Sequence, residues 1–164
     1  MNFEEKFEQL PQPDEISIRE REDAMGAYFM MFAAIAAGLP LPIINLIASI
    51  IYYYLNKAKS LFVKFHAMQS LISQIPTSLI NAGAVFWGIR IIFYEANFTN
   101  VYKGYLVFAV IVNLLYIIFS LIAAVKARSG KFYYFIFFGK YAYLKTFKIR
   151  EKSEKQDVNL PPNL

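Results

Sequence analysis

The side chains that could perform chemistry in this sequence are few. Cysteine is absent, His66 is the only histidine, and Glu95 is the only acid between Asp23 and Glu151. Metal sites need several His, Cys, Asp or Glu ligands, and acid–base hydrolysis usually needs two placed titratable groups. The sequence therefore predicts no catalytic residue, no metal site and no cofactor, and it indicates a protein that is not an enzyme.

Amide and hydroxyl groups form the one polar pattern in the apolar part of the chain. Between residues 66 and 81 they recur at intervals of three and four, which places them on one face of a helix, with Gln74 beside it. Inside a membrane such groups hydrogen-bond to other helices or line polar pathways, and both alternatives stay open. The candidate residues for contact with a helix or a cavity are His66, Gln69, Ser73, Thr77 and Asn81.

The elements that must position this stripe are three uncharged stretches. Residues 24–56, 65–89 and 104–125 contain no Asp, Glu, Lys or Arg, and they are 33, 25 and 22 residues long. A helix needs roughly 20 apolar residues to cross the hydrocarbon core. We therefore predict an all-α integral membrane protein with a single membrane domain over residues 17–147. Three clear transmembrane helices are expected at about 24–56, 65–94 and 104–125.

Proline and glycine interrupt the first stretch, and a proline also lies within the second. Gly38, Pro40 and Pro42 are candidate helix breaks, and Pro76 is a further one. At about 1.5 Å per residue, the first stretch would form roughly 50 Å of helix, which exceeds a 30 Å core. The segment therefore either crosses once with a sharp kink or folds as a hairpin, which would give a four-segment arrangement.

The regions that flank the membrane domain differ in charge. Residues 1–23 carry eight acids and three bases, whereas residues 126–164 carry nine bases and three acids. Residues 1–16 are expected to form a mobile acidic arm, and Ser17 and Glu20 match a capping box that starts a helix. We expect residues 132–147, rich in aromatic residues and interrupted by lysines, to lie in the membrane interface. Residues 148–164 should be a disordered basic tail.

The basic residues predict both topology and partners. Lys57, Lys59 and Lys64 lie between the first two uncharged stretches, and the basic tail follows the third. By the positive-inside rule, this loop and the C-terminus are cytoplasmic, and the expected location is the bacterial inner membrane. The expected partners are anionic lipid headgroups, which the tail would bind, and other membrane subunits or further copies of the chain. We expect no nucleic-acid partner.

Two short segments carry a family resemblance. Residues 62–70, with the sequence FVKFHAMQS, resemble the signature of the Tic-twenty-like family, which includes a chloroplast inner-envelope import component and bacterial relatives. The segment GKFY at 130–133, with Ala142 and Tyr143, resembles the closing motif of that family, although Ile136 replaces its proline. The leading interpretation is a non-enzymatic scaffold or complex subunit, and the resemblance implies a relation to protein translocation. The alternative is a passive small-solute or ion channel or transporter.

Overall fold

The structure is a computed structural model that describes residues 7–33, 42–94 and 97–148. Within these ranges the regular elements are all helices, and strand pairing is limited to an isolated bridge between Phe7 and Lys148. The predicted all-α class is confirmed for this part of the chain. The elements are η1 (Pro13–Glu15), α1 (Ile18–Phe29), η2 (Met30–Phe32), α3 (Pro42–Asn56), α4 (Leu61–Phe93), α5 (Asn100–Arg128) and α6 (Phe138–Phe147).

Local sequence signals account for several of the helix ends. The predicted capping box is confirmed, because the Ser17 hydroxyl accepts from the Glu20 amide and the Glu20 carboxylate accepts from the Ser17 amide. Ser60 caps α4 and Thr99 caps α5 in a similar manner. At the end of α5, Gly130 adopts φ +71°, a conformation that favours glycine and allows the chain to turn away from the helix.

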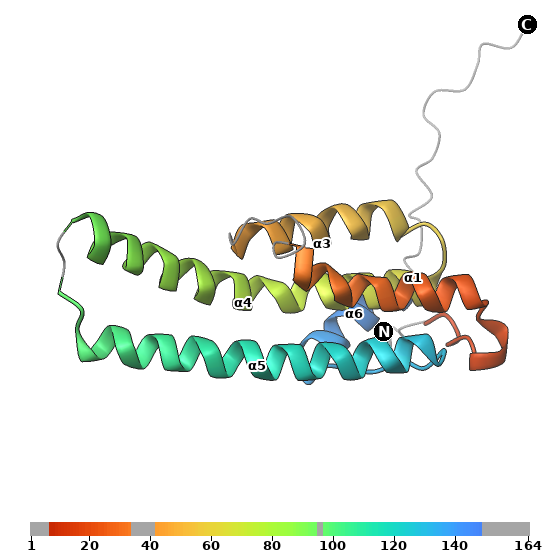
Figure 1. Cartoon of the computed structure of the whole chain (residues 1–164). Helices are drawn as coiled ribbons and strands as arrows, with labels where there is room; N and C mark the ends of the chain where they lie inside the picture. Colours follow the sequence, from red (N-terminus) through yellow and green to blue (C-terminus); the bar gives the residue numbers. More distant parts are fainter. Residues whose placement is uncertain (1–6, 34–41, 95–96, 149–164) are drawn as a thin grey trace, which may run out of the picture.

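The two long helices α4 and α5 lie side by side over most of their length and form the frame of the molecule (Figure 1). They contain 33 and 29 residues, and both are apolar and long enough to cross a bilayer. Only 6% of the most apolar window of α4, and 17% of that of α5, is buried inside the protein. The core helix of a soluble protein would be mostly buried, so these exposed apolar surfaces suit contact with lipid.

The prediction of three clear spans is not confirmed, because the described parts of the first stretch are two short helical pieces that run in opposite directions, which we call the hairpin (Figure 1). Helix α3 contains 15 residues, about 22 Å, and is too short to cross a 30 Å core. The Tyr52 hydroxyl donates to the Asp23 carbonyl (2.7 Å), and Lys59 pairs with the Asp23 carboxylate (2.7 Å). These contacts hold the middle of α1 beside the C-terminal end of α3. Both helices cover only part of α4 (Figure 1).

The outcome differs among the four residues predicted to break helices. Gly38 and Pro40 lie outside the described residues, and Pro42 is the first residue of α3. Pro76 lies inside α4, which continues from Leu61 to Phe93.

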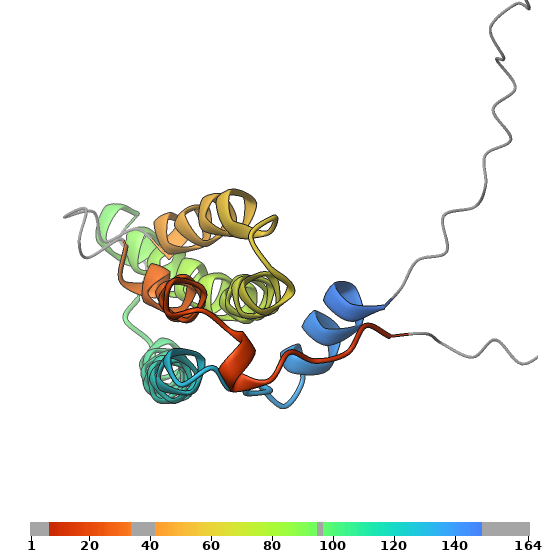
Figure 2. The same cartoon turned by 90° about the vertical axis from the view of Figure 1, so that its right-hand side faces the viewer.

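The segments before α1 and after α5 lie together beside the bundle (Figure 2). Ala142 and Phe147 of α6 are buried with Phe65 of α4, so part of the segment expected in the interface packs against the bundle. Residues 7–16, expected to belong to a mobile arm, contact α6 and the end of α5. The Phe7 ring stacks on Tyr143, with 5.4 Å between ring centroids, and the Glu8 amide donates to the Phe147 carbonyl.

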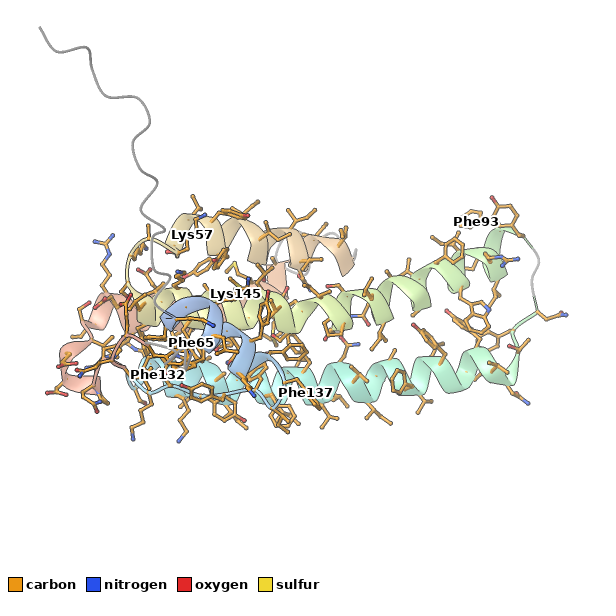
Figure 3. All side chains as sticks on the ribbon, turned by 180° about the vertical axis from the view of Figure 1, so that it is seen from behind. Lys57, Phe65, Phe93, Phe132, Phe137 and Lys145 are labelled. Atoms are coloured by element: carbon orange, nitrogen blue, oxygen red, sulfur yellow. The ribbon has the colours of Figure 1, made fainter. Side chains whose placement is uncertain are left out.

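Small residues allow α1 and α5 to approach closely. Ala24 on α1 is buried in one core with Ala123, Ala124 and Ala127 of α5. The same core contains Ile16, Tyr28, Phe62 and Phe135. Alanine lets helix backbones come near one another, which favours packing in lipid, where water does not drive helices together. The core therefore lies at the end of the bundle that carries Lys57 and Lys145 (Figure 3).

Candidate functional site

The polar stripe of α4 divides into two groups along the helix. The first, which we call the inner cluster, consists of Tyr28, His66 and Gln69 with the backbone of Tyr133 and Phe135. The second consists of Asn81 and its partner on α5. Ser70, Ser73 and Thr77 lie between them.

Gln69 is the centre of the inner cluster and is fully buried. Its side-chain nitrogen donates to the Tyr28 hydroxyl (2.8 Å) and to the Tyr133 carbonyl (2.9 Å). Its oxygen accepts from the Phe135 amide (3.2 Å). A single glutamine thus joins α4 to α1 and to the segment between α5 and α6. Gly139 makes room for this contact, because a Cβ atom there would lie 2.9 Å from the Gln69 oxygen.

A hydrogen bond joins Tyr28 to His66. The Tyr28 oxygen lies 2.9 Å from His66 Nδ1 and accepts from Gln69. Because a hydroxyl oxygen can accept a second hydrogen bond as well as donate one, both tautomers of His66 fit this contact. The three side chains form one connected chain from Gln69 through Tyr28 to His66.

Aromatic rings enclose His66 on several sides. Ring centroids of Phe62, Phe65 and Phe132 lie 4.5, 5.1 and 5.8 Å from that of the imidazole. Figure 3 shows Phe65 and Phe132 together at the end of the bundle near α6. The two segments that carried the family resemblance, 62–70 and 130–133, therefore pack against each other. The aromatic contacts hold the segment that follows α5 against α4, and among the described residues they leave no open site around His66.

The hydroxyl groups of the stripe bond mainly to nearby backbone. Ser70 donates to the Ala27 carbonyl of α1 (2.7 Å), whereas Ser73 and Thr77 donate within α4 to the carbonyls of Ser70 (2.9 Å) and Ser73 (3.5 Å). Ser73 and Thr77 are buried, and both line cavities between α4 and α5. They therefore contribute hydroxyl groups to the interior without joining the helices directly.

Asn81 pairs with Asn113 of α5 near the middle of the uncharged segments. Asn81 Nδ2 donates to Asn113 Oδ1 (3.0 Å), and Asn113 Nδ2 donates to Asn81 Oδ1 (2.7 Å) and to the Ala109 carbonyl (2.7 Å). The sequence prediction included Asn81 but missed Asn113. The available signal was that Asn113 is the only amide side chain in the uncharged segment 104–125.

Sequence reasoning also missed hydroxyl groups that reach from aromatic residues to backbone carbonyls. Tyr102 donates to Ala84 (3.0 Å), and Tyr105 donates to Ile80 (2.8 Å). These bonds join α5 to the part of α4 that lies beyond the hairpin. Within the described residues, no group of three or more His, Cys, Asp or Glu side chains is placed to hold a metal ion.

Comparison with known proteins corrects the family assignment. Residues 22–141 match the model of a family described as the magnetosome magnetite crystal formation protein family. This match covers the hairpin, both long helices and the start of α6, and it overturns the Tic-twenty-like assignment. The link to protein translocation rested on that resemblance, and neither translocation nor a channel is supported by the match. No curated protein and no solved structure matches the chain.

Proposed function

The chain belongs to the MamF/MmsF family, and on that premise we propose that it is a non-enzymatic subunit of a membrane in which magnetite crystals form. The description of the family supports the process, and the two exposed apolar helices support the membrane. In this proposal, the chain acts as a scaffold that holds partner membrane helices in a fixed arrangement.

One observation carries the scaffold proposal: α4 directs its polar and apolar side chains to different partners. The hydrogen bonds of Gln69 and Asn81 are made within the chain, so these groups serve its own assembly. The outward face carries apolar residues at alternating intervals of four and three. Its exposed members are Ile75, Leu79, Ala82, Phe86, Ile89 and Phe93. This spacing is that of a helix packing against another helix.

The outward stripe continues beyond the hairpin. Leu79 and Phe86 are seven residues apart, on one face, and about two thirds of each side chain is exposed. Phe93 lies at the far end of α4 (Figure 3). A helix from a second subunit, or from another copy of this chain, would find a continuous apolar row there. Lipid tails are the competing occupant, because the stripe faces the hydrocarbon.

We also propose a location and orientation. The membrane is the bacterial inner membrane or one derived from it, with the Lys57–Lys64 loop and the C-terminus in the cytoplasm. The structure supports a common side for these segments, because the α3–α4 connection and α6 lie at the same end of the bundle (Figure 1). The positive-inside rule then favours the cytoplasmic side.

A basic pocket at that end offers a place for anionic lipid. A cavity of about 450 Å³ is lined by Lys64 of α4, Lys145 of α6 and Lys148, with Tyr53 and Thr146 among its hydroxyl groups. The Thr146 hydroxyl is buried without a hydrogen-bond partner in the described part of the chain. Glu8 also lines the cavity and offsets one of its three positive charges. We propose that a lipid phosphate binds between these lysines.

The scaffold proposal is tested by expression in a magnetosome-forming host that lacks its own family member. We expect the chain to restore magnetite crystals seen by electron microscopy and to purify with a membrane protein in fixed stoichiometry. The Leu79→Ala/Phe86→Ala variant should insert normally but lose both the partner and the crystals. Leu114→Ala/Ile118→Ala, which shortens two exposed apolar residues of α5, is the matched control. Restored crystals without a partner, or equal effects of both variants, would contradict the proposal.

A further inference from the structure

A partly open cavity with polar and apolar side chains in its wall lies between η2, α3, α4 and α5, close to the middle of the uncharged segments. Its volume is about 160 Å³. Position 77 is the midpoint of the uncharged segment 65–89, and Thr77 lines the cavity. Amide and hydroxyl groups from three helices also line it, namely Asn45, Gln74, Ser78, Asn81, Asn113 and Tyr116. A space at this depth with so many hydrogen-bonding groups requires an explanation.

Gln74 provides the independent evidence for a guest. Its side chain is only 2% exposed, and neither its amide nitrogen nor its amide oxygen has a hydrogen-bond partner in the described part of the chain. Buried polar groups are almost always paired, because an unpaired one loses its bonds to water without replacement. Gln69, five residues earlier on the same helix, shows the usual arrangement, with its nitrogen and oxygen both bonded.

The lining chemistry defines the class of guest. The residues around the cavity are uncharged, and each amide offers both a donor and an acceptor. A full charge at membrane depth would find no opposite charge among these lining side chains, which makes an ion a poor guest. A neutral molecule that both donates and accepts would satisfy both ends of Gln74. Since each water molecule occupies about 30 Å³ in the liquid, the volume suits roughly five waters.

We propose that this cavity binds a small uncharged hydrogen-bonding guest, bonded by Gln74 and by the Asn81–Asn113 pair. The guest is either a cluster of water molecules or one polar molecule of similar size, such as urea or glycerol. The site does not depend on the scaffold function proposed above, because it rests on residues inside a single chain. It also gives the mid-membrane amide pair a role beyond joining α4 to α5.

The first test asks whether a substitution at Gln74 raises or lowers the melting temperature. Gln74→Met keeps the length of the side chain and removes its polar atoms. If the guest is present, the variant loses those bonds and its melting temperature in detergent falls. If the cavity is empty, the variant removes an unpaired buried amide and its melting temperature rises, which would overturn the proposal. Ile75→Leu, at an exposed apolar position of the same helix, is the matched control and should leave the melting temperature unchanged.

The second test measures water access directly, because the chain contains no cysteine. Thiols react as thiolates, which form in water and not in hydrocarbon. We expect Ser78→Cys, in the cavity wall, to react with neutral methyl methanethiosulfonate at least ten-fold faster than Leu79→Cys on the outward apolar face of the same helix. Protection by added urea or glycerol would identify a specific solute, and reaction without protection would identify water. Equal slow reaction at both positions would overturn the proposal.

Discussion

The hydroxyl of Tyr105 on α5 occupies the space beside Gly83 of α4 that any larger residue would need. A Cβ atom on Gly83 would lie 2.5 Å from this oxygen, which donates to the Ile80 carbonyl at 2.8 Å. Tyr102 and Gly88 repeat the arrangement, with 2.8 Å between the hydroxyl and the position of the missing Cβ. In the part of the bundle beyond the hairpin, glycines on α4 thus receive tyrosine hydroxyls from α5.

Replacing Gly83 with alanine should separate these helices locally. The added methyl group must displace the Tyr105 hydroxyl, so we expect a loss of about 1–3 kcal/mol in the free energy of unfolding. Gly104→Ala is the matched control, since a Cβ there would meet nothing within 4 Å. That variant should be neutral or slightly stabilising because alanine favours helix. The measurement is unfolding in mixed micelles, and equal effects of the two variants would refute the close approach.

The inner cluster predicts a large effect for a small change at Tyr28. Tyr28→Phe removes the hydrogen bond to His66 Nδ1 and the acceptor for Gln69, which leaves two buried polar groups with a lost bond. We expect a loss of about 1–3 kcal/mol. Tyr54→Phe, at an exposed position of α3, should change stability little. If the two variants unfold at the same temperature, the hydrogen-bonded chain does not stabilise the fold.

The Asn81–Asn113 pair is best tested by a double-mutant cycle. Replacing either residue with leucine leaves the other amide short of its partner, so the two single losses should exceed the loss in the double variant. Coupling between helices in membranes averages about 0.6 kcal/mol and reaches about 1.7 kcal/mol. Ile80→Leu, one position along the helix, should be nearly silent. Strict additivity of the two asparagine variants would show that the amides act independently.

The long helices could be predicted because charge and length act locally along the chain. Residues 65–89 and 104–125 lie within α4 and α5, and the capping box at Ser17 starts α1 as expected. The hairpin could not be chosen over a kinked span, since both leave the same uncharged stretch in the sequence. It is decided by tertiary contacts, such as the bond from Tyr52 to the Asp23 carbonyl.

The partners in the polar contacts could not be predicted from the sequence either, because they also depend on tertiary structure. Helical spacing placed His66, Gln69 and Asn81 on one face, but their partners Tyr28 and Asn113 lie on other helices, at separations that no local pattern encodes. The wrong family assignment has a related cause. The residues that carried it, including Phe62, Phe65 and Phe132, pack with His66, so they report how this end of the bundle is built and say little about activity.

The start of α1 should make stability depend on pH in the acid range. The hydrogen bond from the Ser17 hydroxyl lowers the pKa of the Glu20 carboxyl in the folded protein. A lowered folded pKa stabilises the protein above the unfolded value of about 4.3, and this contribution is lost as pH falls through the folded pKa. The loss of stability in Ser17→Ala, about 1 kcal/mol for a cap, should therefore shrink as pH falls below about 4.3.

The comparison for this pH effect is Ser129→Ala at the end of α5. Its hydroxyl bonds to the Val125 carbonyl and, among the residues that the structure describes, to no carboxylate, so its effect on stability should not change with pH. Thermal unfolding of the three proteins between pH 3 and 7 gives the result. A Ser17→Ala deficit that stays constant over this range would show that Glu20 is not the titrating partner.

The basic pocket predicts selective binding of anionic lipid. Lys64→Gln and Lys145→Gln each remove one charge from the cavity wall, and a lysine near an anionic surface contributes about 1 kcal/mol. We expect each change to weaken retention of phosphatidylglycerol roughly five-fold, with little effect on phosphatidylcholine. Native mass spectrometry of protein released from nanodiscs of each lipid provides the measurement, and added salt should weaken the difference.

The control for lipid binding lies at the opposite end of the bundle. Lys103→Gln near the start of α5 removes the same charge, but Lys103 lies far from the pocket and its ammonium group sits 5.3 Å from the centroid of the Phe98 ring. If all three lysine variants lose phosphatidylglycerol equally, binding depends on net charge and not on a formed site. If Lys64→Gln and Lys145→Gln alone lose it, and inorganic phosphate does not compete, the pocket recognises the phosphate within a lipid, held between α4 and α6.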